Sequence, residues 1–152
     1  MTPAVEACRR AGVAFELHEY EGADVGDGDG DYAVAVAQAL GRPPAQLFKT
    51  LLASVGESLR VFVVPADRQL DLRAAGKRAR MADRALAERT TGYVAGGISP
   101  LGQRKRLPTT LDESALQWET ILVSAGRRGL QIELRPDDLV VLTGAAVAPV
   151  AA

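Results

Sequence analysis

Two apolar, β-rich runs separated by a short turn constrain the fold of this chain more than any other feature. The runs span 48–55 and 59–65, and Gly56-Glu57-Ser58 between them is a hairpin signal. Apolar residues fall on both faces of these runs, which is typical of strands that are covered on both sides. The sequence therefore predicts a hairpin at the centre of a larger sheet.

The other predicted elements mix helices and strands without strict β-α-β alternation. Helices are expected at 3–12, 32–40, 71–76, 83–91 and 136–144, and further strands at 14–20, 107–111, 120–124 and 130–134. The helix starts are marked by Thr2, Asp71 and Asp83 as capping residues. This pattern favours one α+β domain over 1–152, with a mixed, largely antiparallel sheet or barrel-like core flanked by helices.

Composition points to an ordinary globular protein with 47% apolar and 24% charged residues. No apolar run is long enough to span a membrane and no secretory leader is visible, so we expect a cytoplasmic protein without a membrane partner. The single cysteine, Cys8, excludes an internal disulfide and a multi-cysteine zinc site. Its spacing from Val5 on a predicted helix indicates core packing rather than a nucleophile.

The charges are sorted along the chain although the net charge is only −1. Acidic residues crowd 16–31, whereas arginine and lysine fill 68–106. The low net charge argues against capture of nucleic acid by bulk electrostatics. A local basic face could still hold a phosphate-bearing ligand with modest affinity, and the alternative is a set of solvated helix surfaces.

Lys49 is an unexpected charge in the apolar run Leu47-Phe48-Lys49-Thr50-Leu51-Leu52. Burial of an unpaired charge costs several kcal/mol at least, so such a lysine usually reaches water or holds an anion. The alternative is an exposed lysine on the edge of a sheet. The sequence thus marks Lys49 as a candidate site residue without deciding between these two interpretations.

Several motifs fail on inspection. The acidic run 27–31 resembles the start of a calcium loop, but Tyr32 stands where glycine is needed and Gln38 replaces the closing glutamate. His18 is the only histidine, which excludes a histidine-rich metal centre. The glycines of 96–102 match neither the Walker nor the dinucleotide fingerprint. Nothing in the sequence indicates ATP or NAD.

The glycine-rich segment 91–102 suggests a different kind of site. Glycines allow the backbone to approach a ligand closely, and successive N–H groups can form an anion or oxyanion site. Such amides stabilise the charge on a carbonyl oxygen during acyl transfer, by about 3 kcal/mol per donor in good cases. The alternative is a tight turn between strands.

A set of ordered motifs resembles the YbaK/EbsC family of aminoacyl-tRNA deacylases, which are related to the editing domain of bacterial prolyl-tRNA synthetase. The resemblance runs from Thr2 to the last helix. The motifs are Phe48-Lys49-Thr50-Leu51, Thr91-Gly92-Tyr93, the turn 96–102 with Gln103-Arg104-Lys105-Arg106, and Ser124-Ala125-Gly126-Arg127-Arg128-Gly129-Leu130.

The resemblance implies hydrolysis of the ester that joins a mischarged amino acid to tRNA, most plausibly cysteine on proline tRNA, with prolyl-tRNA synthetase as a partner. It makes Lys49 the essential lysine, Gly96 the glycine whose backbone faces the ester, and Tyr20 the pocket tyrosine. The substrate-binding residues it implies are Tyr32, Thr50, Gly97, Ile98, Ser99, Pro100, Gly102 and Ser124. It implies no metal and no cofactor, because the substrate thiol is expected to attack its own carbonyl.

The sequence departs from the family pattern at the second helix, where Tyr32-Ala33-Val34-Ala35 replaces a phenylalanine-glycine-acid-acid opening, and at Ala125, which replaces a frequent glycine. The preferred amino acid is therefore less certain than the reaction. An alanine-specific deacylase and a non-catalytic module that binds tRNA or a synthetase remain alternatives.

Overall fold

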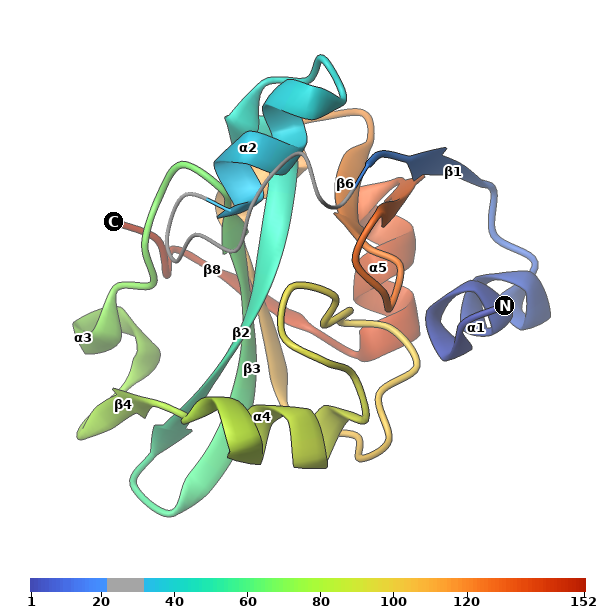
Figure 1. The fold of residues 1–152 in the computed structure, drawn as a ribbon. Coiled ribbons are helices and arrows are strands. Elements are labelled where there is room, and N and C mark those ends of the chain that lie inside the picture. The colour runs from blue at the N-terminus through green and yellow to red at the C-terminus, as the bar shows by residue number, and fades with distance from the viewer. Residues whose placement is uncertain (22–31) are drawn as a thin grey trace.

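The hairpin of β2 (Leu47–Val55) and β3 (Ser58–Pro65) forms the centre of one mixed sheet. The computed structural model describes residues 1–21 and 32–152. The strand order is β1-β7-β6-β2-β3-β5-β8, with β4 paired to β2 off this path (Figure 1). The predicted central hairpin and the mixed α+β architecture are confirmed.

Most of the remaining elements were expected from the sequence, but the short strands β4 and β8 were not. The other strands are β1 (Phe15–Glu19), β4 (Ala79–Met81), β5 (Thr109–Asp112), β6 (Ile121–Ser124), β7 (Leu130–Leu134) and β8 (Ala146–Ala148). The helices are α1 (Pro3–Ala11), α2 (Tyr32–Ala39), α3 (Leu72–Ala75), α4 (Arg84–Thr91) and α5 (Pro136–Thr143), with short 3₁₀ turns η2 (Pro44–Gln46) and η3 (Glu113–Gln117). None of the helices that the structure describes is long and apolar enough to cross a membrane.

Local side-chain bonds explain where the helices begin. The Thr2 hydroxyl accepts a hydrogen bond from the Val5 amide at 3.2 Å and starts α1. The Asp83 carboxylate accepts from the Leu86 amide at 2.7 Å and starts α4, as predicted. The helix α4 ends at Gly92, which adopts the left-handed conformation with φ +83°.

Apolar clusters cover both faces of the central strands. Phe48 belongs to the largest cluster, which includes residues of α1 and α5, whereas Leu47 packs in a second cluster with α2. Alternate residues of β2 thus enter different cores, as expected for a strand covered on both sides. Cys8 is fully buried in the largest cluster, which confirms its predicted packing role.

The β2 strand has a gap along one of its two edges. Its β3 edge is paired along the whole strand. On the opposite edge, β6 pairs in parallel only with Leu47 and Phe48, and β4 pairs with Ala53–Val55. Between these two partners, 49–52 have no strand beside them among the described residues. Because a missing strand leaves space at the level of the sheet, this gap is where a ligand can reach the interior of the fold.

Candidate functional site

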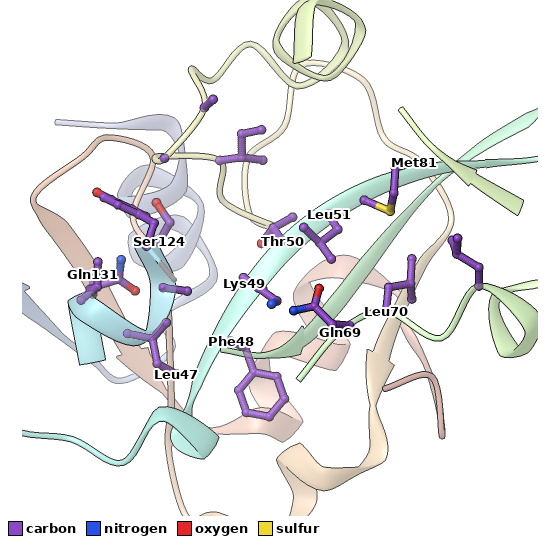
Figure 2. A pocket seen from close by; sticks show the side chains of 17 residues that line it. Leu47, Phe48, Lys49, Thr50, Leu51, Gln69, Leu70, Met81, Ser124 and Gln131 are labelled. Atoms are coloured by element: carbon purple, nitrogen blue, oxygen red, sulfur yellow. The ribbon is translucent and has the colours of Figure 1, made fainter. Parts of the chain in front are cut away.

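A cavity of about 510 Å³ lies at the gap in β2 (Figure 2). It is lined by residues from α2, β2, β4, β6, β7, the connection from β3 into α3, and the glycine-rich turn: Tyr32, Ala33, Val36, Leu47, Phe48, Lys49, Thr50, Leu51, Gln69, Leu70, Leu72, Met81, Ala95, Gly96, Ile98, Ser124 and Gln131. A mostly apolar hollow with a few polar groups is typical of a small-ligand site. The structure therefore brings Tyr32, Thr50, Ile98 and Ser124 together with Lys49 and Gly96, as the sequence predicted.

Lys49 is half-buried on an interior strand, so the alternative of an exposed edge lysine is wrong. Its ammonium donates a long hydrogen bond of 3.4 Å to the Ala66 carbonyl. Burial lowers the pKa of Lys49, and the nearby Asp67 carboxylate partly opposes this shift. No carboxylate forms an ion pair with Lys49 within the described ranges. Its charge is thus available to an anionic ligand.

The cavity has a polar end and an apolar end, with Lys49 between them (Figure 2). Ser124 and Gln131 lie at the polar end, on the neighbouring strands β6 and β7. Leu70 and Met81 lie at the opposite end. Leu72, which begins α3, also lines the cavity. A ligand with a polar head and a flat apolar portion would match this division.

Two polar atoms of the lining are buried without a hydrogen-bond partner in the part of the chain that the structure describes. They are the Thr50 hydroxyl and the Gln131 Oε1 atom. Buried polar groups are nearly always paired in proteins, so such exceptions point to a functional contact. Gln131 is only 4% exposed.

The glycine-rich turn contributes Ala95, Gly96 and Ile98 to the lining of the cavity, but not Gly97. Gly96 lines the cavity at φ +88°, and its N–H has no acceptor among residues 1–21 and 32–152. The Gly97 amide instead donates to the Val94 carbonyl at 2.9 Å and closes the turn. The expectation that Gly97 also faces the ligand is therefore wrong, because its N–H is already engaged.

The second half of the turn packs away from the cavity. Ser99 is fully buried, and its hydroxyl accepts from the Leu101 amide at 3.2 Å. Pro100 and Gly102 line a separate hollow of about 210 Å³. A Cβ on Gly102 would come within 2.6 Å of the Pro3 backbone. The expected substrate-binding roles of Ser99, Pro100 and Gly102 do not fit this placement, because the turn folds back onto α1.

Tyr20 contacts Tyr32, which lines the cavity, but Tyr20 itself is not a lining residue. The two hydroxyl oxygens lie 3.3 Å apart, and both side chains pack against the cluster under α2. The Arg128 guanidinium stacks over the Tyr32 ring at 4.5 Å from the ring centroid. A Cβ on Gly96 would come within 2.6 Å of that same guanidinium. Tyr20 thus contacts Tyr32 directly, and Arg128 packs against both Tyr32 and Gly96.

A buried carboxylate network fixes the strand that carries Gln131. Arg42, just after α2, donates to both Glu133 oxygens at 3.0 and 2.8 Å. His18 lies 2.8 Å from Glu133, and the Thr120 hydroxyl donates at 2.5 Å. The Arg42 hydrogen bonds, with smaller contributions from Thr120 and His18, lower the pKa of Glu133 to about 2. This network ties α2, β1 and β7 together beside the cavity.

The same network contains the one candidate metal cluster found among the described residues. Ligand atoms of Glu16, His18 and Glu133 lie within 4.8 Å of one another. The Arg42 guanidinium already occupies both Glu133 oxygens and places a positive charge there. The donor set is therefore better suited to an ion-pair network than to a cation.

The sequence did not single out Gln131, Met81 or the leucines of the apolar end. Gln131 carried no special signal, because 130–134 alternates apolar and polar residues as an ordinary half-buried strand does. Met81 and Leu72 carried no signal either, because apolar residues are common near any core.

Comparison with known proteins adds four findings. The family model of the aminoacyl-tRNA editing domain matches residues 28–142. EbsC of Enterococcus faecalis, provisionally named a Cys-tRNA(Pro)/Cys-tRNA(Cys) deacylase, is 42% identical over 118 residues, which cover 73% of this chain and 71% of that protein.

Among solved structures, a provisionally assigned trans-editing enzyme for prolyl-tRNA synthetase has a TM-score of 0.80 at 26% identity and matches 100% of this chain and 99% of its own. The hypothetical protein APE2540 has a TM-score of 0.86 at 24% identity, covering 99% of this chain and 100% of its own, and shows the fold alone.

Proposed function

Because this chain belongs to the family of aminoacyl-tRNA editing domains, we propose that it is a trans-editing deacylase that hydrolyses the ester between a mischarged amino acid and the 3′ end of tRNA. The observation that carries the proposal is the half-buried Lys49 ammonium, which pairs with no carboxylate of the described residues, in the cavity that Gly96 also lines. A cation for phosphate and an amide for a carbonyl oxygen are what this reaction needs. The whole chain, 1–152, acts in this proposal as one editing domain.

Cys-tRNA(Pro) is the proposed substrate. EbsC, which is 42% identical, is named for Cys-tRNA(Pro) and Cys-tRNA(Cys). An alanyl ester is the main rival, since the opening of α2 at Tyr32 departs from the family pattern. The amino acid would lie at the polar end of the cavity, where Ser124 and Gln131 can hydrogen-bond its amino group.

The proposed roles follow from the placement of each group. The Lys49 ammonium holds the terminal phosphate or ribose, and the free Gly96 amide stabilises negative charge on the ester carbonyl oxygen. Thr50 and Ile98 line the same space and contact the substrate. Tyr20 acts through Tyr32, whose ring it holds in place.

With a cysteinyl ester, the substrate can supply its own nucleophile. The thiol sulfur attacks the carbonyl carbon, the ester C–O bond breaks, and the thiol proton passes to the departing ribose oxygen. Water then opens the resulting thiolactone to give free cysteine. Proximity and orientation in the cavity would supply much of the rate, because the attack is intramolecular.

Association with prolyl-tRNA synthetase and a cytoplasmic location are parts of the same proposal. A structure 26% identical to this chain is described as a trans-editing enzyme for prolyl-tRNA synthetase. A net charge of −1 also suits an editor that gains tRNA affinity from a partner, because few phosphate contacts leave binding weak at cellular salt.

The test is a deacylation assay of Cys-tRNA(Pro) and Ala-tRNA(Pro) with wild type, Lys49→Ala and the matched surface control Lys105→Ala. We expect Lys49→Ala to lose about a hundredfold in rate, on the scale of a substrate displaced by about 1 Å from its reactive position. Lys105 is exposed, so Lys105→Ala should keep wild-type activity. Circular dichroism checks that both variants fold.

Two results would oppose the proposal. If wild type hydrolyses neither ester faster than buffer while binding tRNA, the chain is a non-catalytic module. If Lys49→Ala keeps full activity, the cavity is not the reaction site. Faster turnover of the alanyl ester would keep the deacylase but replace cysteine as its amino acid.

A further inference from the structure

A second, open hollow of about 370 Å³ lies beside the apolar end of the cavity and is lined by cations. Its lining consists of Leu72, Arg73, Gly76, Lys77, Arg78 and Ala79, from α3 and the start of β4. The segment is held against β2, because β4 pairs with Ala53–Val55. A Cβ on Gly76 would come within 2.5 Å of Val55. The hollow is thus a fixed part of the fold.

This basic hollow adjoins the cavity. Leu72 lines both spaces. Met81, which ends β4, lines the cavity, and Ala79, which begins β4, lines the hollow. Leu72 and Met81 are 39% and 47% exposed, so the apolar end of the cavity opens to solvent where the hollow begins.

The cations of the hollow have no acidic counterparts. Arg73, Lys77 and Arg78 are exposed, and none of them takes part in an ion pair within 1–21 and 32–152. The nearest acid in sequence, Asp71, is engaged as a helix cap and accepts hydrogen bonds from the Arg73 and Ala74 amides. Three unneutralised cations around one hollow attract a polyanion.

We propose that the single-stranded 3′ end of the tRNA leaves the cavity through this basic hollow, with its phosphates on Arg73, Lys77 and Arg78. The inference rests on the proposed function and adds to it the path that the tRNA strand takes out of the cavity. With the amino acid at Ser124 and Gln131, the terminal adenine lies on the apolar surface of Leu72 and Met81. The next phosphates in the 5′ direction then meet the cations.

The test compares two substrates that share the reacting ester. Cys-tRNA(Pro) carries the strand, whereas the cysteinyl ester of adenosine has no phosphate beyond the nucleoside. The variant Arg73→Gln/Lys77→Gln should slow hydrolysis of the tRNA ester and leave the nucleoside ester at its wild-type rate. The matched control is Arg9→Gln/Arg10→Gln, which removes two exposed charges from α1 on the opposite side of the fold (Figure 1).

The salt dependence gives a second, quantitative measure. Each lost contact to a single-stranded phosphate lowers the slope of log affinity against log salt by about 0.7, so two contacts change it by about 1.4. Between about 50 and 200 mM salt, kcat/KM of wild type should fall about sevenfold more than that of the Arg73→Gln/Lys77→Gln variant. Arg78→Asn tests the third cation, since asparagine tolerates the φ of +58° at this position.

The outcomes separate this inference from the proposed function. If wild type hydrolyses both esters but the Arg73→Gln/Lys77→Gln variant matches wild type on tRNA at every salt concentration, the route is wrong and the deacylase stands. Equal loss on both esters would also overturn the route, because the variant then damages the cavity. If wild type hydrolyses neither ester, the proposed function itself fails.

Discussion

Replacement of Glu133 by glutamine should cost the fold a large part of its stability at neutral pH. The Glu133 side chain is only 11% exposed and accepts hydrogen bonds from Arg42 and Thr120, with His18 at 2.8 Å. These contacts lower its pKa from the ordinary 4.5 to about 2. Each pH unit of pKa change is worth about 1.4 kcal/mol, so the ionised carboxylate contributes roughly 3 kcal/mol to the free energy of unfolding.

The pH dependence of this contribution has a definite sign. A depressed folded pKa means that the unfolded chain binds a proton more readily than the folded chain. The stabilisation is therefore fully present above the unfolded pKa of 4.5 and is lost as the pH falls toward the folded pKa of about 2. Glu133→Gln lacks the charge at every pH. The difference between wild type and variant should approach roughly 3 kcal/mol at pH 7 and shrink steadily toward pH 2.

The assay is urea unfolding at several pH values, followed by fluorescence of Trp118, the only tryptophan, which packs against the largest core cluster. Hydrogen bonds from Ser114, Val150 and Ala151 outweigh burial and lower the pKa of Asp112, which also adds to acid unfolding. That contribution is common to both proteins and cancels in the difference. The control Glu119→Gln removes an exposed carboxylate. A difference that stays constant from pH 7 to pH 2.5, or one no larger than that of the control, would refute the reasoning.

Two further predictions concern the turn and the core. Gly97→Ala should lower the free energy of unfolding by about 1–3 kcal/mol, because its Cβ would come within 2.8 Å of the Arg127 backbone. Backbone atoms cannot move aside as a side chain can. A urea unfolding curve identical to that of wild type would contradict this prediction. In the folded protein, Cys8 should react slowly with a thiol reagent at pH 8, because it is buried and because burial, aided by the Asp138 charge, raises the pKa of its thiol. In urea the reaction should be rapid. Rapid labelling of the folded protein would contradict this prediction and show that α1 opens readily.

Elements with strong local signals could be predicted from the sequence. The β2–β3 hairpin, the caps at Thr2 and Asp83, and the stop at Gly92 appear where expected because neighbouring residues determine them. The strands β4 and β8 have only three residues each and carry no periodic pattern. They exist because β2 and β5 offer edges to pair with, which is a property of the assembled sheet.

The glycine-rich turn shows why half of the candidate site could not be predicted. Sequence marks the flexible positions but not the direction in which the chain runs between them. The Tyr93 hydroxyl donates to the Leu101 carbonyl at 2.6 Å and closes the loop over a buried anchor. That bond brings Gly96 toward β2 and carries Pro100 and Gly102 to α1, so residues four apart face different spaces. The acidic run 27–31, considered for its likeness to a calcium loop, lies outside the described residues.

The position of Lys49 follows from two local signals that meet only in the folded protein. The β6 strand stops after Ser124 because Gly126 and Gly129 turn the chain with φ of +103° and +92°. The β4 strand stops at Met81 because Asp83 caps the helix that follows. Each stop can be read from the sequence, but their placement on one edge of β2 depends on the parallel register Leu47–Leu122 and the antiparallel register Ala53–Met81. Residues 49–52 are what remains between them. A charge in an apolar run is tolerated there because no strand of the described residues lies beside it, so that the Lys49 ammonium meets a cavity rather than a core.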